Sequence, residues 1–187
     1  FGEILAEGSK KASEIIGRGT DEYLITSKGQ EAPAHMPQVK RSLSVIYAAN
    51  PFGADHESSE HDPSYKAYPE RMKEIGLNNP QEKLALNKEM MRFAMVTQHF
   101  SSAVDSVNVC DFVYGPSWQL YTSQQLVQTI NAVMGWDVDI NELLEVGERR
   151  LNMLRAFNSR EGVGRESDTL PKKMFKRPLT GGRSDGY

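Results

Sequence analysis

The 187-residue chain lacks several features that mark particular classes of protein. It has one cysteine, Cys110, which excludes an internal disulfide. It has no apolar run near the roughly 20 residues that cross a bilayer. Its 22 basic and 25 acidic residues nearly balance, for a net charge of -3, so no broad positive field attracts nucleic acid or an anionic membrane. We therefore expect a cytoplasmic protein with neither nucleic acid nor a membrane as partner.

What the sequence does contain is apolar residues at helical spacing, with little strand signal. Proline, glycine and capping residues delimit the segments, most clearly where Asp139 and Glu142 form a capping-box pattern. Asn79 with Glu82 predicts a second capped start. We expect helices over residues 4–16, 37–51, 80–103, 123–134 and 140–157. The predicted fold class is all-α, an irregular helical bundle in one lobe or two.

Two observations concern how the chain is organised. Residues 51–70 form a long, polar, irregular stretch, typical of either a functional loop or disorder. The chain also starts at Phe1 in helical pattern and ends in TGGRSDGY. We therefore expect a piece of a longer polypeptide, with residues 1–62 a helical segment plus active-site loop and residues 63–187 a second helical domain.

The loop ADHESSEHDP concentrates histidine and carboxylate groups that can carry protons or bind cations. A solvated acidic loop, in which His61 and Asp62 cap a turn before Pro63, explains the same residues. The spacing of His56 and His61 is not a recognised zinc pattern. Their proximity in one loop also fits poorly with a metal-dependent phosphohydrolase, which needs its first histidine on a separate helix.

The lone thiol in VDSVNVCDFV allows three interpretations. A single cysteine in an apolar run is most often a small buried hydrophobic residue. A nucleophile needs a base beside it, and the nearest histidine in sequence, His99, lies eleven positions back. An iron–sulfur cluster takes four thiolates, so Cys110 would need three ligands from outside this chain.

Four stretches give the chain a family resemblance: KGQEAPAHMP, SLSVIYAANPFGADHESSEHDP, DSVNVC and GERRLNMLRAFNSREGVGRESDTLPKKMF. In order and spacing they resemble the carboxy-terminal helical part of the tungsten-containing aldehyde ferredoxin oxidoreductases. The resemblance spans nearly the whole chain. Residues 147–175 carry its most specific part.

The resemblance implies two cofactors, a tungsten bis-pyranopterin and a neighbouring 4Fe–4S cluster. A family motif of the form D-x-x-G-L-C places its Asp on a pterin and its Cys on the cluster. Asp105, Val109 and Cys110 stand at the matching cofactor-binding positions, with Cys110 also the metal ligand. Asn108 replaces the usual Gly and Val109 the usual Leu, and Asn tolerates the left-handed conformation better than most residues.

The resemblance also implies a catalytic histidine near the tungsten, and His56 in YAANPFGADH is the matching residue, with His61 in reserve. An imidazole there can hydrogen-bond a carbonyl or carry a proton. The sequence assigns no clear role, structural or phosphate-facing, to four polar residues of the most specific stretch: Arg149, Arg155, Asn158 and Arg160.

The implied function is oxidation of an aldehyde to a carboxylic acid at tungsten or molybdenum, with electrons leaving through the 4Fe–4S cluster to ferredoxin. Its expected partners are ferredoxin, the aldehyde substrate and the remainder of the same polypeptide. We expect this chain alone to be inactive and to contain neither cofactor. A non-enzymatic alternative is a helical scaffold derived from the family, for which Asn108 in place of Gly is the supporting residue.

Overall fold

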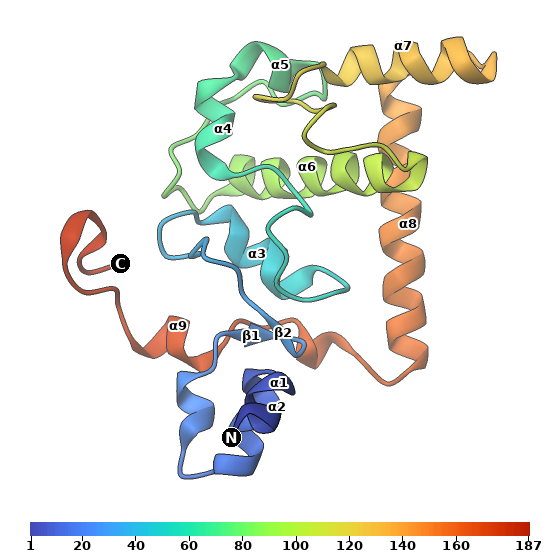
Figure 1. Ribbon diagram of the computed structural model, residues 1–187. Helices are drawn as coiled ribbons and strands as arrows, with labels where there is room; N and C mark the ends of the chain where they lie inside the picture. The colour runs from blue at the N-terminus through green and yellow to red at the C-terminus, as the bar shows by residue number, and fades with distance from the viewer.

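The computed structural model describes residues 1–187 and is mostly helical, which confirms the expected class (Figure 1). One small antiparallel hairpin pairs β1 with β2. The elements in chain order are α1 (Gly2–Ala6), α2 (Ser9–Ile16), η1 (Thr20–Tyr23), β1 (Thr26–Ser27), β2 (Gln30–Glu31), α3 (Ser42–Ala49), α4 (Asp62–Ala67), α5 (Pro69–Lys73), α6 (Lys88–Val107), α7 (Ser123–Met134), α8 (Ile140–Arg160), η2 (Arg165–Ser167), α9 (Lys172–Lys176) and η3 (Gly182–Ser184).

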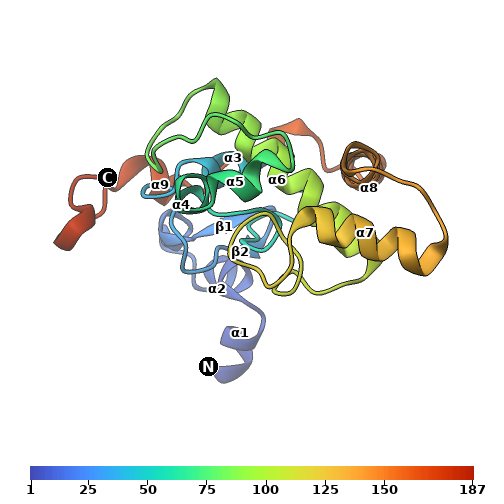
Figure 2. The same cartoon turned by 90° about the horizontal axis from the view of Figure 1, so that it is seen from above.

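The two longest helices, α6 and α8, cross at one side of the fold, where α8 passes the carboxyl-terminal half of α6 (Figures 1 and 2). Gly147 of α8 lies against the backbone of α6, where an added Cβ would overlap the carbonyl oxygen of His99. The close crossing therefore requires glycine at this position. Around α6 lies the main core, formed by Tyr65, Met72, Ile75, Leu77, Met90, Phe93, Val96, Phe100, Ala103, Val104, Leu126, Val127 and Leu143.

A second, smaller core forms on the other side of α6, where α3 packs (Figure 1). Leu43, Ile46 and Tyr47 of α3 are almost completely buried there together with Ala94 of α6. This contact joins the two predicted segments across α6. The proposed boundary at residue 62 stays a prediction.

Three predicted helix starts or extents are wrong. The long central helix begins at Lys88, because Asn87 and not Asn79 caps it: the Asn87 side chain accepts a hydrogen bond from the amide of Met90 at 2.9 Å. The helix predicted from Pro37 begins at Ser42, after a turn over residues 37–41. The first helix is divided at Gly8, whose φ of 85° leaves the helical region.

The stretch 51–70 is only partly a loop, since it contains α4 and the start of α5. Proline lies in the first turn of both helices, where its missing N–H costs nothing.

The last two predicted helices are confirmed at their starts, and both carry complete capping boxes, Thr122 with Gln125 and Asp139 with Glu142. The helix α8 runs three residues further than predicted, to Arg160.

The end of the chain returns to its beginning. Lys172 and Lys176 of α9 pair with Asp21 and Glu22 of η1, each at 2.8 Å.

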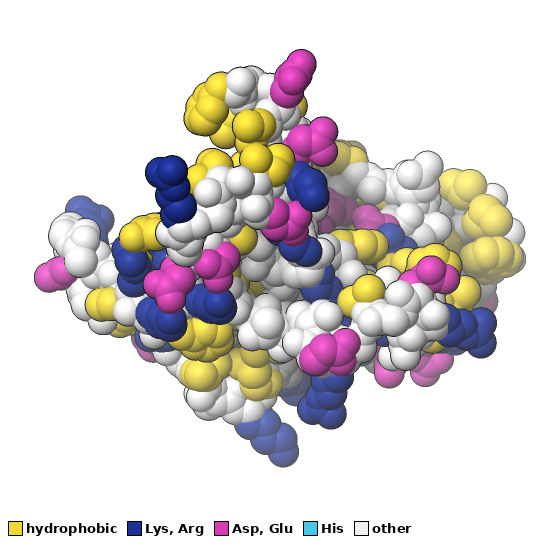
Figure 3. Space-filling view, turned by 90° about the horizontal axis from the view of Figure 1, so that it is seen from below, with side chains coloured by type: hydrophobic (Ala, Val, Ile, Leu, Met, Phe, Trp, Pro, Cys, Tyr) yellow, Lys and Arg dark blue, Asp and Glu magenta, His cyan; other side chains and the backbone are white.

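On the face in Figure 3, acidic and basic side chains are interspersed. None of the helices combines the length and apolar character that a bilayer crossing requires.

Candidate functional site

A cavity of about 200 Å³ lies between the loop after α3, the start of α4, the carboxyl-terminal half of α6 and the segment that follows Cys110. Three of the chain's four histidines line it, His35, His56 and His61. The other lining groups that matter chemically are three carboxylates and an aromatic wall: Glu57, Glu60, Asp111, Phe100, Phe112, Tyr114 and Trp118. The cavity thus combines proton carriers with an apolar surface for a small organic group.

The three imidazoles pack against one another, and we call them the histidine cluster. The ring centroid of His35 lies 4.8 Å from that of His56 and 4.4 Å from that of His61. Lys40 Nζ lies 2.9 Å from His35 Nδ1 and 2.8 Å from His61 Nδ1. His56 Nε2 instead meets a carboxylate oxygen of Glu57 at 2.7 Å. The cluster therefore has a cation at one end and an anion at the other.

Two buried or half-buried carboxyl groups of the cavity have raised pKa values. Burial raises the pKa of Glu60, although hydrogen bonds from Gln119 (2.6 Å) and Ser117 (2.7 Å) oppose the change. Burial raises the pKa of Asp111 to about 6, and the neighbouring carboxylates Asp105 and Glu57 add to the effect. The cavity can therefore retain carboxylic protons at a pH where ordinary surface carboxyls have lost them.

Cys110 lies just past the carboxyl end of α6, with its side chain exposed. Asn108 makes the turn that directs it outward, with φ 57° and ψ 45° in the left-handed region. Glycine is the usual residue at such a helix end, and asparagine is the common substitute. Val109 packs partly against the main core, and its amide bonds to the carbonyl of Val104 at 3.4 Å. The turn therefore separates an inward valine from an outward thiol.

Asp105 precedes Cys110 by just over one helical turn and is also exposed. Its Oδ2 pairs with Arg150 of α8 at 2.9 Å, and Oδ1 is not part of this ion pair. Neither Asp105 nor Cys110 lines the cavity, but the next residue, Asp111, does. The chain has no group of three or more His, Cys, Asp or Glu side chains arranged to hold a metal ion. A cofactor at Cys110 would need further ligands from elsewhere.

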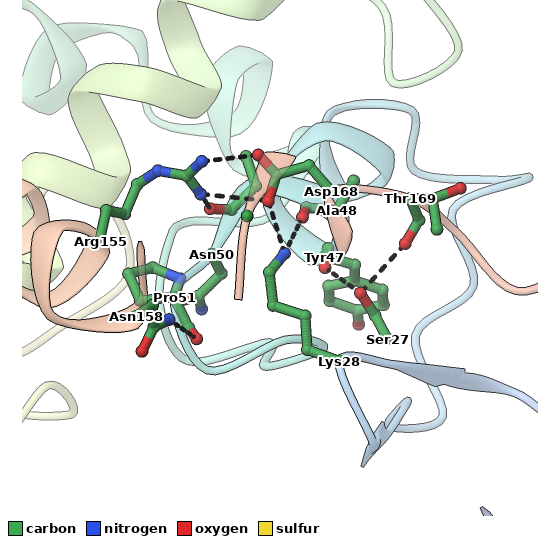
Figure 4. A network of polar contacts seen from close by, with 12 residues as sticks. Ser27, Lys28, Tyr47, Ala48, Asn50, Pro51, Arg155, Asn158, Asp168 and Thr169 are labelled. Carbon is green, nitrogen blue, oxygen red and sulfur yellow. Dashed lines mark hydrogen bonds and ion pairs between the residues drawn. The ribbon is translucent and has the colours of Figure 1, made fainter. Parts of the chain in front are cut away.

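Polar contacts from α8 and the segment after it hold the base of the loop that carries His56 (Figure 4). Arg155 donates to the carbonyl of Ala49 at 2.7 Å and pairs with Asp168 at 2.6 Å. Lys28 pairs with the same carboxylate at 2.8 Å and donates to the carbonyl of Ala48. These cations satisfy carbonyls that the end of α3 leaves without helical partners.

Two further hydrogen bonds complete this network. Asn158 donates to the carbonyl of Pro51 at 2.8 Å, and Ser27 Oγ contacts the carbonyls of Tyr47 (2.7 Å) and Thr169 (3.1 Å) (Figure 4). Arg155 and Asn158 are therefore structural in this chain. The network accounts for much of the stretch 147–175. Arg149 and Arg160 remain exposed on α8, Arg149 with only a 3.8 Å contact to Glu145.

Of the residues singled out from the sequence, His56 and His61 line the cavity together, and Asp105, Val109 and Cys110 share the turn at the end of α6. Sequence reasoning missed His35 and Lys40. Their spacing from His56 marks no pattern, because the whole of α3 lies between them and the loop. The available signal for His35 was the small number of histidines, of which the chain has only four.

Comparison with known proteins now adds to this geometry. The family model described as aldehyde ferredoxin oxidoreductase, domains 2 and 3, matches residues 1–187. The chain belongs to this family. It is 30% identical to the tungsten-containing aldehyde ferredoxin oxidoreductases of Pyrococcus horikoshii and Pyrococcus abyssi and 29% identical to that of Pyrococcus furiosus. Each match covers 100% of this chain and 29% of the relative.

Family membership supports an oxidoreductase in general terms, and the resemblance drawn from the sequence is confirmed. The chain spans less than a third of the length of these curated relatives. The relatives are correspondingly larger polypeptides, in which the matched region is one part. The roles of individual residues in this chain remain to be argued from its own geometry.

Proposed function

We propose that this chain is the helical part of an oxidoreductase that oxidises aldehydes to carboxylic acids and passes the electrons to ferredoxin. The remainder of the same polypeptide completes the site. The observation that carries the proposal is the exposed thiol of Cys110, presented by the left-handed turn at Asn108 in a chain of this family. A thiol buried among hydrocarbon side chains would have removed the basis for it.

The residues at the end of α6 fit a shared cofactor site. Cys110 would supply one thiolate of a 4Fe–4S cluster, a group that takes four. Asp105, one of whose carboxylate oxygens pairs with Arg150, would present the other oxygen to a pterin. Val109 fills the apolar position between them. The tungsten or molybdenum bis-pyranopterin, when bound, supplies the oxygen transfer and the redox chemistry.

His56 is the proposed catalytic residue of this chain. Its imidazole lines the cavity and lies 2.7 Å from a carboxylate oxygen of Glu57, so the pair can accept a proton at the ring and hold the resulting charge. Oxidation of an aldehyde to a carboxylic acid releases protons. We propose that His56 accepts one of them and that the cavity's aromatic wall excludes water from the reacting group.

The two alternatives lack a specific observation. Asn108 adopts the left-handed conformation that glycine would adopt, so it no longer argues for a scaffold with a decayed site. A phosphohydrolase would need Asp62 as a metal ligand. Asp62 is fully buried, and its oxygens accept hydrogen bonds from the amide of Ser42 at 2.7 Å and from the Ser42 hydroxyl at 2.5 Å.

The test uses the complete polypeptide, expressed anaerobically, with aldehyde-dependent reduction of a viologen dye and iron analysis as readouts. We expect Cys110→Ala to lose cluster iron and dye reduction. Asn108→Gly is the matched control two residues away, because it keeps the turn without the asparagine side chain, and we expect wild-type iron and activity. Full activity and iron in Cys110→Ala would contradict the proposal.

A second comparison isolates the histidine. We expect His56→Ala to retain iron but to lose most of the aldehyde oxidation, because the proton acceptor is missing while the cofactor residues are intact. Lys66→Ala is a suitable control, since Lys66 forms only an exposed pair with Glu82. Wild-type turnover in His56→Ala at all pH values would remove His56 from the mechanism.

A further inference from the structure

Lys40 joins two rings of the histidine cluster in a way that restricts where their protons lie. Its Nζ is 2.9 Å from His35 Nδ1 and 2.8 Å from His61 Nδ1. A lysine ammonium has three donors and no acceptor. Both Nδ1 atoms must therefore accept, which places the single hydrogen of each neutral imidazole on Nε2.

The opposite side of the His61 ring is also engaged. Its Nε2 lies 3.2 Å from the carbonyl oxygen of His56, an acceptor that requires a hydrogen on that nitrogen. Lys40 and the carbonyl thus specify the same tautomer from two sides. A second proton on His61 would have to enter at Nδ1 and displace the lysine.

His35 is fixed through its backbone as well as its ring. The hydroxyl of Tyr47, a completely buried residue of α3, donates to the carbonyl of His35 at 2.9 Å. The ring of His35 also lines the cavity. The ring is therefore held on its Lys40 side.

His56 differs from its two neighbours in its partner. Its Nε2 meets the carboxylate of Glu57 at 2.7 Å, whereas the hydrogen bonds of Lys40 go to His35 and His61. An ionised carboxylate only accepts hydrogen bonds, so it can pair with a protonated nitrogen of the His56 ring. Among the three packed imidazoles, only this one has a contact that a second ring proton would strengthen.

We propose that Lys40 is a positioning residue that locks His35 and His61 as neutral imidazoles with hydrogen on Nε2, so that His56 alone in the cluster exchanges a proton. The proposal concerns only atoms of this chain. It rests on the proposed function for the use of the exchanged proton, and its test does not measure enzyme activity.

The charges around the cluster agree with this division. Burial, then the charge of Lys40, lowers the pKa of His61 to about 4 and lowers the pKa of His35 as well. Burial also lowers the pKa of Lys40, which Asp62 of α4 opposes and Lys83 reinforces. The other charged or titratable groups that line the cavity are His56, Glu57, Glu60, Asp111 and Tyr114. Lys40 is therefore the nearest cation to both rings.

The experiment measures proton occupancy histidine by histidine in the complete polypeptide. Deuterium exchange at the imidazole C2 position, followed by peptide mass spectrometry across a pH series, gives a separate profile for each ring. In the wild type we expect the profiles of His35 and His61 to stay flat through the neutral range. In Lys40→Met we expect the pKa of His61 to rise by about one unit or more, because the adjacent positive charge is gone.

Lys83→Met is the matched control, because it removes an exposed cation near Lys40 that contacts neither ring. We expect its profiles to follow the wild type. An equal rise in the pKa of His61 in both variants, or no rise in Lys40→Met, overturns the proposal. If Lys40→Met fails to fold by circular dichroism, the wild-type profiles decide: neutral-range titration of His35 or His61 overturns the proposal regardless of whether the polypeptide oxidises aldehydes.

Discussion

The loop of residues 50–61 and the segment of residues 108–114 carry the two halves of the proposed site, and the chain holds them very differently. Side chains from two distant segments hold the base of the first: Lys28 and Arg155 donate to the last carbonyls of α3, and Asn158 donates to the carbonyl of Pro51. The buried side chain of Asn50 adds a hydrogen bond to Ser58 at 2.6 Å inside the loop. The histidines are thus presented by a framework that this chain builds unaided.

The segment 108–114 has little of this support. Its turns rest on backbone hydrogen bonds, such as that from the amide of Val113 to the carbonyl of Cys110 at 2.9 Å. Phe112 and the thiol are exposed. The difference indicates that proton-handling residues must be preorganised by the fold, whereas a residue that binds a large cofactor acquires its surroundings from that cofactor and from other parts of the protein.

Asp168→Ala tests the loop side of this comparison and should have the largest effect. It leaves Lys28, whose side chain is 6% exposed, without its carboxylate partner. Loss of one partner of a buried pair typically costs about 3 kcal/mol or more. Urea denaturation followed by circular dichroism measures the change. Asp137→Ala, at an exposed site, should change the free energy of unfolding by less than about 0.5 kcal/mol.

Gly147→Ala tests the helix crossing that supports both regions. The added methyl group would overlap the carbonyl oxygen of His99, so α8 must move away from α6. Overpacking of this kind costs about 1–3 kcal/mol. Gly2→Ala is a control with open space at its Cβ, and it should leave the thermal midpoint unchanged. Equal midpoints for the two variants would show that the crossing is looser than described.

The pH dependence of stability sharpens the comparison, since only the loop side has histidines held neutral. The pKa of His61 is about 4 when folded and 6.5 ordinarily. Between these values the unfolded chain binds a proton that the folded chain does not, so His61 makes stability rise with pH over this window and level off above it. The difference between wild-type and His61→Gln unfolding curves isolates the effect. A difference that is flat from pH 4 to 6.5 would contradict it.

Asn108→Ala probes the turn that presents Cys110. A residue with Cβ and no side-chain amide is less stable in the left-handed region, by about 1–2 kcal/mol. Asn108→Gly should be neutral or slightly stabilising, because glycine adopts this conformation freely. Denaturation midpoints in the order Gly, Asn, Ala would support the turn, and a reversed order would refute it.

Cys110→Ser should have the smallest effect of all on the folded chain. The exposed thiol makes no packing contact of consequence, so the free energy of unfolding should change by less than about 0.5 kcal/mol. The same substitution should abolish cluster binding in the complete polypeptide if the proposal holds. A large loss of stability without any cofactor would mean that the thiol is a packing residue.

Local signals predicted some of the fold well. The capping box of Asp139 and Glu142 and the stop at Gly135 are encoded within a few residues, and both helices start or end as expected. The cap at Asn79 failed because an equally good candidate, Asn87, lies nearer to the buried run that begins at Met90. Short-range patterns cannot choose between two caps when burial decides.

The candidate site was only half predictable for a similar reason. His56 and Cys110 stood out in the sequence as part of a loop rich in histidine and carboxylate groups and as the lone thiol, and the roles that the family resemblance gave them are still predictions. Lys40 and His35 are brought to the loop by the packing of α3, which no local pattern specifies. The roles of Arg155 and Asp168 in holding the loop likewise depend on the path of the chain after α8.

The contact of Ser27 with Thr169 joins residues 142 positions apart. A ribosome that adds about 5–20 residues per second needs roughly 7–28 seconds to make that interval. The loop of residues 50–61 is therefore anchored only after α8 and the segment after it have been made, and until these emerge the nascent chain has this region open on one side.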